Sequence, residues 1–135
     1  MAKKNKQPFA DHNASINPKS DRFGTVWDSM LKSKAWQSLT CGDKYFYIMC
    51  RVQSQSEDGK RCLYMHGAKF GITYNHNKDF VFPREHLLNY GFDNRNSTKS
   101  FKRLAAAGFI EYKECNKPRQ MVNVYSFSDK WKHIN

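Results

Sequence analysis

The stretch from Phe82 to Phe127 constrains the fold of this chain more than any other. Pro83–Asn89 suits a short helix, because a proline at the first helical position loses no hydrogen bond. A turn is expected at Gly91, since glycine adopts positive φ at little cost. Asp93 can cap a second helix, which the spacing of apolar residues predicts over 94–107. The buried side of this second helix is expected to carry Phe101, Leu104, Ala105 and Gly108.

Two β-rich runs follow the second helix. They are Phe109–Cys115 and Met121–Phe127, and residues 116–120 join them. Two such runs around a short polar connection predict a β-hairpin. A helix, a glycine turn, a helix and a hairpin, in this order, form the winged helix-turn-helix plan. The sequence therefore predicts an α+β fold in which N-terminal helices pack on a helix-turn-helix followed by a β-hairpin wing.

Three helices are predicted before this stretch. The first lies within 21–31, the second is Ser33–Leu39, and the third begins at Thr40 and ends near Gln53. Thr40 and Asp43 have the spacing of a capping box. The predicted buried side chains are Phe23, Val26, Trp27, Met30 and Leu31 on the first helix, Trp36 and Leu39 on the second, and Tyr45, Ile48, Met49 and Val52 on the third.

Residues 54–81 give weaker signals. A polar loop is expected at 54–59, and Leu63, His66 and Phe70 indicate a short helix that ends at Gly71. Short strands are expected at Ile72–Tyr74 and Phe80–Phe82, around a turn at 75–78. The second of these strands would be the first strand of the winged sheet. At the C-terminus, one helical turn is expected to pack Trp131 and Ile134 back on the domain.

The length of 135 residues favours one domain, which we place at 21–135. Residues 1–20 are polar and basic without periodicity, and predict a disordered N-terminal arm. Through Lys3, Lys4 and Lys6 this arm could lie along a phosphate backbone or enter a minor groove. An inert terminus is the alternative.

The charge of the chain indicates a polyanionic partner. Its formal net charge is +11, from 23 Lys and Arg against 12 Asp and Glu. A chain this basic commonly binds nucleic acid, although a solvated basic surface would have the same composition. Residues 94–119 hold seven basic and two acidic residues, a net charge of +5 in about a fifth of the length. The excess charge therefore concentrates on the second helix and the hairpin.

The charges of the second helix lie opposite its predicted buried side. Arginine pairs with guanine edges and asparagine with adenine edges, whereas lysine suits phosphates. The predicted DNA-binding residues of this helix are Asn94, Arg95, Asn96, Lys99, Ser100, Lys102 and Arg103. An ordinary solvated helix face is the alternative.

The wing supplies a second set of candidate DNA contacts. Lys113, Lys117 and Arg119 lie on the hairpin, and Pro118 stiffens its tip. A basic tip of this kind can enter a narrow minor groove, which attracts arginine. A hairpin that only supports the fold is the alternative.

Features of enzymes, metal proteins and membrane proteins are missing from the sequence. It has no His-x-His pair, no cluster of acidic residues, no Walker A motif and no Gly-x-Ser-x-Gly. We therefore expect no catalytic residues, cofactor or metal. A zinc site could be drawn from Cys62, His66, His76 and Cys115, but no Cys-x-x-Cys pair supports it.

No secretory signal or membrane-spanning run is found, so we expect a cytoplasmic protein whose four cysteines, Cys41, Cys50, Cys62 and Cys115, are reduced.

Several segments resemble small winged-helix proteins of plasmids, phages and integrative conjugative elements. They are Leu31–Thr40, Gly91–Phe92 with Thr98–Leu104, Ala107–Ile110 and Asn123–Trp131. The resemblance covers Phe23 to Ile134 except residues 60–78, which could be an insertion. It implies a winged helix that binds double-stranded DNA in a mobile element.

The resemblance leaves three roles open: an accessory factor near a transfer origin, a transcriptional regulator, and a replication initiator. Partners would be double-stranded DNA and other proteins of a transfer, replication or transcription complex. The oligomeric state is open, with a dimer on DNA as one option.

A winged helix can also be a protein-interaction module that does not touch DNA. The face of the second helix distinguishes the two functions. An interaction module should expose apolar residues there, whereas a DNA-binding protein should expose a cationic stripe.

Overall fold

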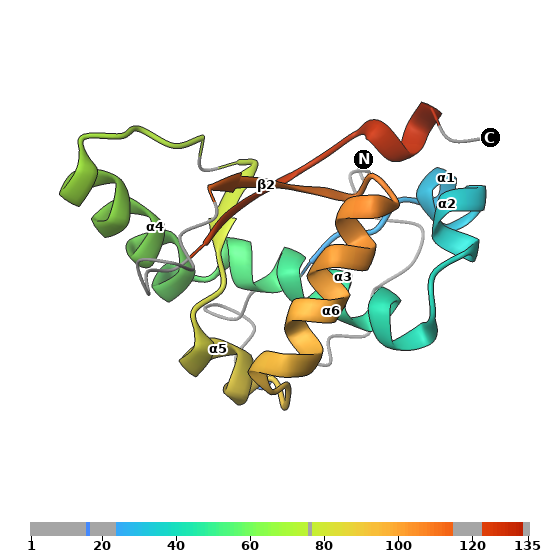
Figure 1. Ribbon diagram of the computed structural model, residues 1–135, viewed down its shortest axis with the longest axis horizontal. Coiled ribbons are helices and arrows are strands. Elements are labelled where there is room, and N and C mark those ends of the chain that lie inside the picture. The colour runs from blue at the N-terminus through green and yellow to red at the C-terminus, as the bar shows by residue number, and fades with distance from the viewer. Residues whose placement is uncertain (1–15, 17–23, 76, 115–122, 134–135) are drawn as a thin grey trace, which may run out of the picture.

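The computed structural model describes residues 16, 24–75, 77–114 and 123–133, which form helices around a small antiparallel sheet (Figure 1). The elements follow the order α1 (Asp28–Leu31), α2 (Lys34–Gln37), α3 (Cys41–Gln55), α4 (Glu57–Phe70), β1 (Asp79–Val81), α5 (Arg84–Asn89), α6 (Asn94–Ala106), β2 (Ile110–Glu114), β3 (Val124–Phe127) and the 3-10 helix η2 (Lys130–His133). The predicted α+β class is confirmed.

The sheet has the strand order β1-β3-β2, and both pairings are antiparallel. Phe80 lies opposite Tyr125, and Ile110 lies opposite Phe127. A β-bulge interrupts the second pairing between Tyr112 and Glu114. Every residue of the central strand β3 is buried, so the sheet is covered on both faces.

The two faces of the sheet contact different clusters. On one face lies a large aromatic core, in which the Phe101 ring of α6 stacks on Tyr125 at a centroid distance of 4.0 Å. Phe46 of α3 meets Phe101 edge-on at 4.8 Å. The second cluster is small and consists of Leu63, Tyr74, Val81 and Val124. Because Leu63 belongs to α4, this helix covers the face of the sheet that turns away from α3 and α6.

The elements predicted for the segment 82–127 agree with the structure wherever its residues are described. Gly91 has φ 85°, as the predicted turn requires, and the Asp93 carboxylate accepts from the Asn96 N–H at 2.7 Å to cap α6. Pro83 is the N-cap of α5 rather than its first residue. The hairpin of β2 and β3 forms, and β1 is the first strand of the sheet, as predicted.

The C-terminal turn packs closely on the start of β2. Trp131 of η2 is buried and its ring stacks on Phe109 at 5.8 Å. A Cβ on Gly108 would lie 2.6 Å from the Trp131 nitrogen, and Gly108 has φ 88°. Only glycine fits at the end of α6 for both reasons. Ile134 lies outside the described residues.

The predicted first helix and the predicted stripe of α3 are each only partly right. Of the described residues 24–31, Asp28–Leu31 is helical, and Met30 is buried as predicted, but the side chains of Trp27 and Leu31 are exposed. On α3, Tyr45 and Ile48 are exposed, whereas Met49 is buried as predicted. The observed stripe is Phe46, Met49, Cys50 and Gln53, flanked by Asp43 and Tyr47. Both stripes satisfy helical spacing, and the observed one contains polar residues that a count of apolar positions overlooks.

The polar loop predicted at 54–59 is also wrong. The Ser56 hydroxyl accepts from the Gly59 N–H at 2.9 Å and caps α4, which ends at Gly71 as predicted. Residues 72–74 lie beside α4 and are not a strand. The arm at 1–20, Ile16 apart, and the segment 115–122 are outside the described residues.

Candidate nucleic-acid interface

α6 is fixed on the body by its buried side. Phe101 and Leu104 are 3% and 0% exposed, and Ser97 is buried beside them. α5 and the turn at Gly91 precede Asp93, which caps α6 and sets where this helix begins. The opposite side of α6 is left to solvent along its length.

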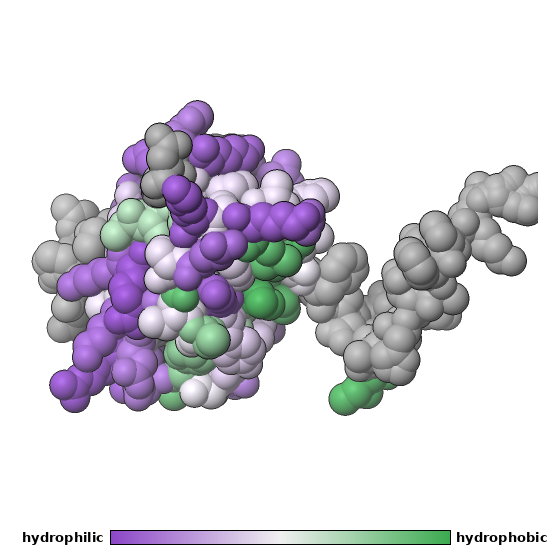
Figure 2. Space-filling model, turned by 90° about the vertical axis from the view of Figure 1, so that its right-hand side faces the viewer, coloured by the Kyte–Doolittle hydropathy of each residue, from purple (hydrophilic) through white to green (hydrophobic). Residues whose placement is uncertain are grey.

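Three cations form the centre of that exposed side. Arg95, Lys99 and Lys102 are spaced at i, i+4 and i+7, and all three are exposed. None of them forms an ion pair with a residue that the structure describes. We call these three residues the α6 basic face. In Figure 2, the side of the molecule that carries α6 is at the left and is largely hydrophilic.

Several other cations of the described residues are paired with an acid, whereas Lys34, Lys60 and Lys69 are exposed on other elements and do not form a row on one helix. The observed pairs are Lys32–Asp28, Arg61–Asp58, Arg103–Asp43, Lys113–Asp79, Lys130–Glu111 and Lys132–Asp129. The α6 basic face therefore carries positive charge that is not compensated locally.

The two predicted asparagines lie at the start of α6 and are exposed. The Asn96 amide donates to the Asp93 carboxylate at 3.2 Å, so it takes part in the helix cap. The Asn94 backbone carbonyl accepts from the hydroxyls of Ser97 and Thr98. Both asparagines therefore flank the α6 basic face at its N-terminal end.

Ser100 does not lie on the exposed side, contrary to the prediction. Ser100 is 4% exposed, and its hydroxyl donates to the Asp43 carboxylate at 3.0 Å. Ser100 follows Ser97 by three positions and precedes Leu104 by four, and both of these residues are buried. This spacing places Ser100 on the buried side of the helix.

Arg103 is engaged by the same carboxylate. Its Nε donates to Asp43 Oδ2 at 2.6 Å and its Nη2 donates to Asp43 Oδ1 at 3.0 Å, which is a bidentate pair. The side chain of Asp43 is 2% exposed and that of Arg103 is 52% exposed. Burial acts to raise the pKa of Asp43, but hydrogen bonds from Arg103 and Ser100 outweigh it and hold this pKa below its usual value. Arg103 thus joins α6 to α3.

Sequence reasoning assigned Asp43 only to the cap of α3. The Thr40 hydroxyl does accept from the Asp43 N–H at 3.1 Å, but the carboxylate of Asp43 points to α6. The available signal was an acidic residue in phase with the buried Phe46 and Cys50, three and seven positions later. A buried acid requires a cationic partner elsewhere in the fold.

On the wing, only Lys113 belongs to the described residues. Its Nζ lies 2.8 Å from Asp79 Oδ2, and the side chain of Asp79 is 1% exposed. Burial acts to raise the pKa of Asp79, and hydrogen bonds from Lys113 and the Asn75 N–H outweigh it, so that this pKa is lowered. Lys113 therefore links the outer strands β2 and β1 across the central strand β3. Lys117, Arg119 and the arm residues Lys3, Lys4 and Lys6 lie outside the described residues.

The described residues contain no group of three or more His, Cys, Asp or Glu that could hold a metal ion. Two members of the zinc alternative, His76 and Cys115, lie outside them. Cys41, Cys50 and Cys62 are free thiols. Within the same part of the chain, no helix combines the length and apolarity needed to cross a membrane.

Comparison with known proteins identifies no relative. No protein-family model matches the chain, and searches of curated proteins and of solved structures gave no significant match.

Proposed function

We propose that this protein is a winged helix-turn-helix protein that binds double-stranded DNA, with α6 as its recognition helix. The observation that carries the proposal is the α6 basic face. Arg95, Lys99 and Lys102 are exposed, lie in one helical phase and lack an acidic partner among the described residues. Uncompensated cations in a row on a helix match the phosphates along a major groove.

The order of elements around α6 supports the same proposal. α5, the turn at Gly91, α6 and the β2–β3 hairpin follow one another, and β1 completes the sheet beside β3. This is the order of a winged helix. In such a protein the second helix of the pair enters the major groove, and the hairpin lies over the adjoining backbone.

The rival function, a protein-interaction module, requires an apolar surface on α6. The exposed large hydrophobic residues of the described chain lie elsewhere, and none belongs to α6. The exposed positions of this helix are Asn94, Arg95, Asn96, Lys99, Lys102, the paired Arg103 and the small Ala106. This composition favours DNA over an apolar partner.

Within the interface, the residues divide by their chemistry. Arg95 lies in the first turn of α6, where a recognition helix meets base edges, and its guanidinium suits guanine. Lys99 and Lys102 lie further along and suit phosphates, which fix register. Arg103 and Lys113 act as positioning residues, since buried carboxylates hold them.

The binding test uses fluorescence anisotropy with labelled duplex DNA over a range of salt concentrations. The wild type should bind, and log affinity should fall with log salt by about 0.9 for each phosphate contact. Replacing Arg95, Lys99 and Lys102 together with alanine should weaken binding and reduce that slope by up to about three units. The matched control replaces three exposed lysines outside α6: Lys34, Lys60 and Lys69.

A flat salt response, or an equal loss of affinity in the control variant, would contradict the proposal.

The cellular process in which the protein acts is a separate question. As the resemblance suggests, we propose an accessory role near the transfer origin of a mobile element, or transcriptional regulation. Fragments of the element's own DNA selected by the protein would map to a transfer origin in the first case and to a promoter in the second.

A further inference from the structure

α4 presents apolar residues to solvent on the side that turns away from the sheet. Leu63, His66 and Gly67 face inward and are buried. On the outer side, Tyr64 and Met65 are 66% and 61% exposed. A surface helix ordinarily carries charged and polar residues on its outer side. Two large apolar side chains exposed in succession are instead typical of a surface that a partner covers.

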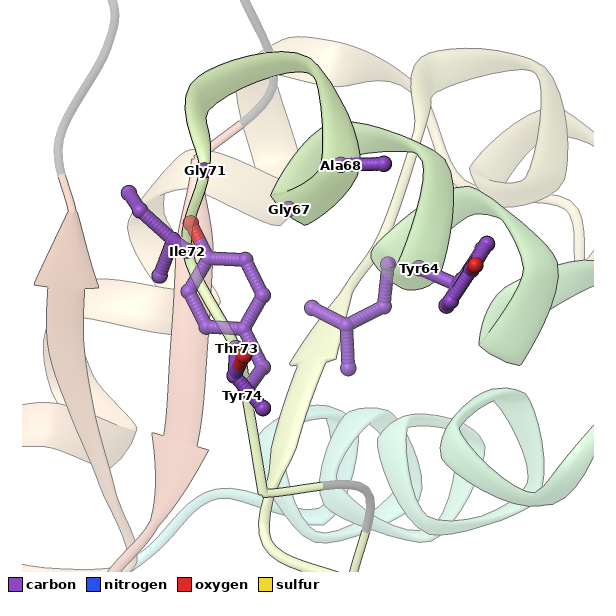
Figure 3. Close-up of a pocket in the computed structure, with 8 residues that line it drawn as sticks. Tyr64, Gly67, Ala68, Gly71, Ile72, Thr73 and Tyr74 are labelled. Carbon is purple, nitrogen blue, oxygen red and sulfur yellow. The ribbon is translucent and has the colours of Figure 1, made fainter.

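A groove of about 350 Å³ lies beside these side chains (Figure 3). Tyr64, Gly67 and Ala68 of α4 line one side of it, and Ile72 and Tyr74 of the segment that follows the helix line the other. The segment lies this close because residue 67 is glycine, where a Cβ would be 2.4 Å from the Ile72 carbonyl oxygen. Ile72 is 40% exposed, so the groove is open to an apolar side chain of a partner.

A lysine adjoins each of the two exposed apolar side chains. Lys60 precedes Tyr64 by four positions and Lys69 follows Met65 by four, which places each pair side by side on the helix. Both lysines are exposed, and neither forms an ion pair with a residue that the structure describes. We call Lys60, Tyr64, Met65, Lys69 and Ile72 the α4 surface.

The α4 surface carries an excess of positive charge. From Gly59 to Lys78 the chain has no Asp or Glu. The two acids of α4, Glu57 and Asp58, lie in its first turn, where Asp58 Oδ1 is paired with Arg61 Nη2 at 3.1 Å. Glu114, beyond the groove, accepts a hydrogen bond within the fold. Exposed apolar side chains between unpaired cations are complementary to an apolar side chain flanked by acids.

We propose that the α4 surface binds an acidic segment of a partner protein. An apolar side chain of that segment enters the groove, and its carboxylates pair with Lys60 and Lys69. Burial of the apolar side chain supplies most of the affinity, and the charges set the orientation of the segment. A second copy of the chain fits less well, because it would bring lysines of both copies together. DNA fits less well because its interfaces are polar and would leave Tyr64 and Met65 without apolar partners.

The position of α4 separates this surface from the one proposed to bind DNA. α4 lies at the left of Figure 1, apart from α6 near the centre. A partner on the α4 surface therefore leaves the α6 basic face free. The inference does not rest on the proposed function, and if the protein binds no DNA the inference stands.

Selection from a library of random peptides displayed on phage tests the inference. Peptides retained by the wild type should be enriched in Asp and Glu around an aromatic or aliphatic residue. One such peptide, synthesised with a fluorescent label, is then the probe in anisotropy titrations.

Replacing both Lys60 and Lys69 with glutamate should weaken binding of the probe about tenfold or more, because two favourable pairs become repulsive. A probe with lysine in place of its acids should show the opposite preference. Tyr64→Ala should also weaken binding of the acidic probe about tenfold, whereas its matched control Leu88→Ala, at a position 58% exposed on α5, should not. Thermal unfolding of these variants should match the wild type, since surface substitutions seldom alter stability.

The variant with alanine at Arg95, Lys99 and Lys102 shows whether the acidic probe merely replaces DNA. This variant should bind the probe as the wild type does. Loss of the probe in it would place the peptide on the α6 basic face and would overturn the inference. The inference also fails if selection does not enrich acidic peptides, or if charge reversal at Lys60 and Lys69 leaves binding unchanged.

Two further measurements identify other occupants of the α4 surface. Self-association that Met65→Glu abolishes in sedimentation would assign the surface to a second copy. Loss of duplex binding on charge reversal at Lys60 and Lys69 would assign it to DNA. Either result would overturn the inference, whereas amide NMR shifts confined to residues 60–74 on addition of the probe would support it.

Discussion

Replacing Arg103 with alanine is expected to destabilise the fold, although this side chain is half exposed. The substitution removes two charged hydrogen bonds from Asp43, whose carboxylate is 2% exposed and retains the Ser100 hydroxyl as a donor. Breaking a fully buried ion pair costs about 3–5 kcal/mol. Because the solvent that surrounds half of Arg103 can partly replace it, we expect a loss of about 1–3 kcal/mol.

Urea unfolding followed by circular dichroism measures this loss. Lys99→Ala is the matched control, since Lys99 lies on the same helix, is exposed and has no acidic partner among the described residues. Its effect should stay within about 0.5 kcal/mol. A double-mutant cycle with Asp43→Asn isolates the pair, because Arg103→Ala should cost less once the carboxylate is gone.

Two results would refute this reasoning. One is an Arg103→Ala variant as stable as Lys99→Ala. The other is an equal cost of Arg103→Ala with and without Asp43→Asn, which would mean that the two side chains do not interact. In either case Arg103 would be free to contact DNA as an ordinary surface cation.

Three further predictions concern the core, the buried acids and the wing. Phe101→Ala should cost about 2–5 kcal/mol in urea unfolding, because it leaves a cavity between Phe46 and Tyr125. The pKa of Asp43 is lowered in the folded state despite burial, so its contribution is present above about pH 4 and is lost as pH falls through the folded value. The stability of Asp43→Asn should therefore fall less than that of the wild type as pH drops below about 4, which acid unfolding followed by circular dichroism measures. Replacing both Lys117 and Arg119 with alanine should lower the salt slope of DNA binding by about 1–2 units in anisotropy titrations, and an unchanged slope would leave the wing a structural role only.

The segment 82–127 could be predicted because its signals are local. A proline, a glycine with positive φ, a capping aspartate and one apolar stripe each act within a few residues of chain, and all agree there. The exposed positions of Arg95, Lys99 and Lys102 follow from the same stripe. No distant part of the chain is needed to place them.

The end of α4 was predicted at Gly71, but a polar loop was predicted where this helix begins. In the structure Gly59 lies in the first turn of α4, where a Cβ would be 2.3 Å from the Gln53 carbonyl oxygen. The glycine is needed because α3 and α4 meet closely, which is a tertiary contact. Ser56 followed by Glu57 and Asp58 is nevertheless a local signal for the start of a helix.

Arg103 and Lys113 show that the sequence does not predict which cations form ion pairs within the fold. Both lie in the most basic segment, and both are held by carboxylates, Asp43 on α3 and Asp79 on β1, that are distant in the chain. A buried carboxylate without a cationic partner destabilises the fold, so these two cations are held in ion pairs within the protein.

What these two pairs achieve is to fix the elements proposed to contact DNA. The pair of Asp43 and Arg103 sets how α6 sits on α3. The pair of Asp79 and Lys113 links the outer strands β1 and β2 across the central strand β3. A recognition helix reads bases only if its side chains are held within a fraction of an ångström of the right place. If the protein binds DNA as proposed, fewer cations reach the DNA than the sequence predicts, but they are held on a rigid support. Loss of either pair should accordingly weaken discrimination between DNA sequences more than it weakens binding to DNA in general, because phosphate contacts tolerate displacement better than base contacts do.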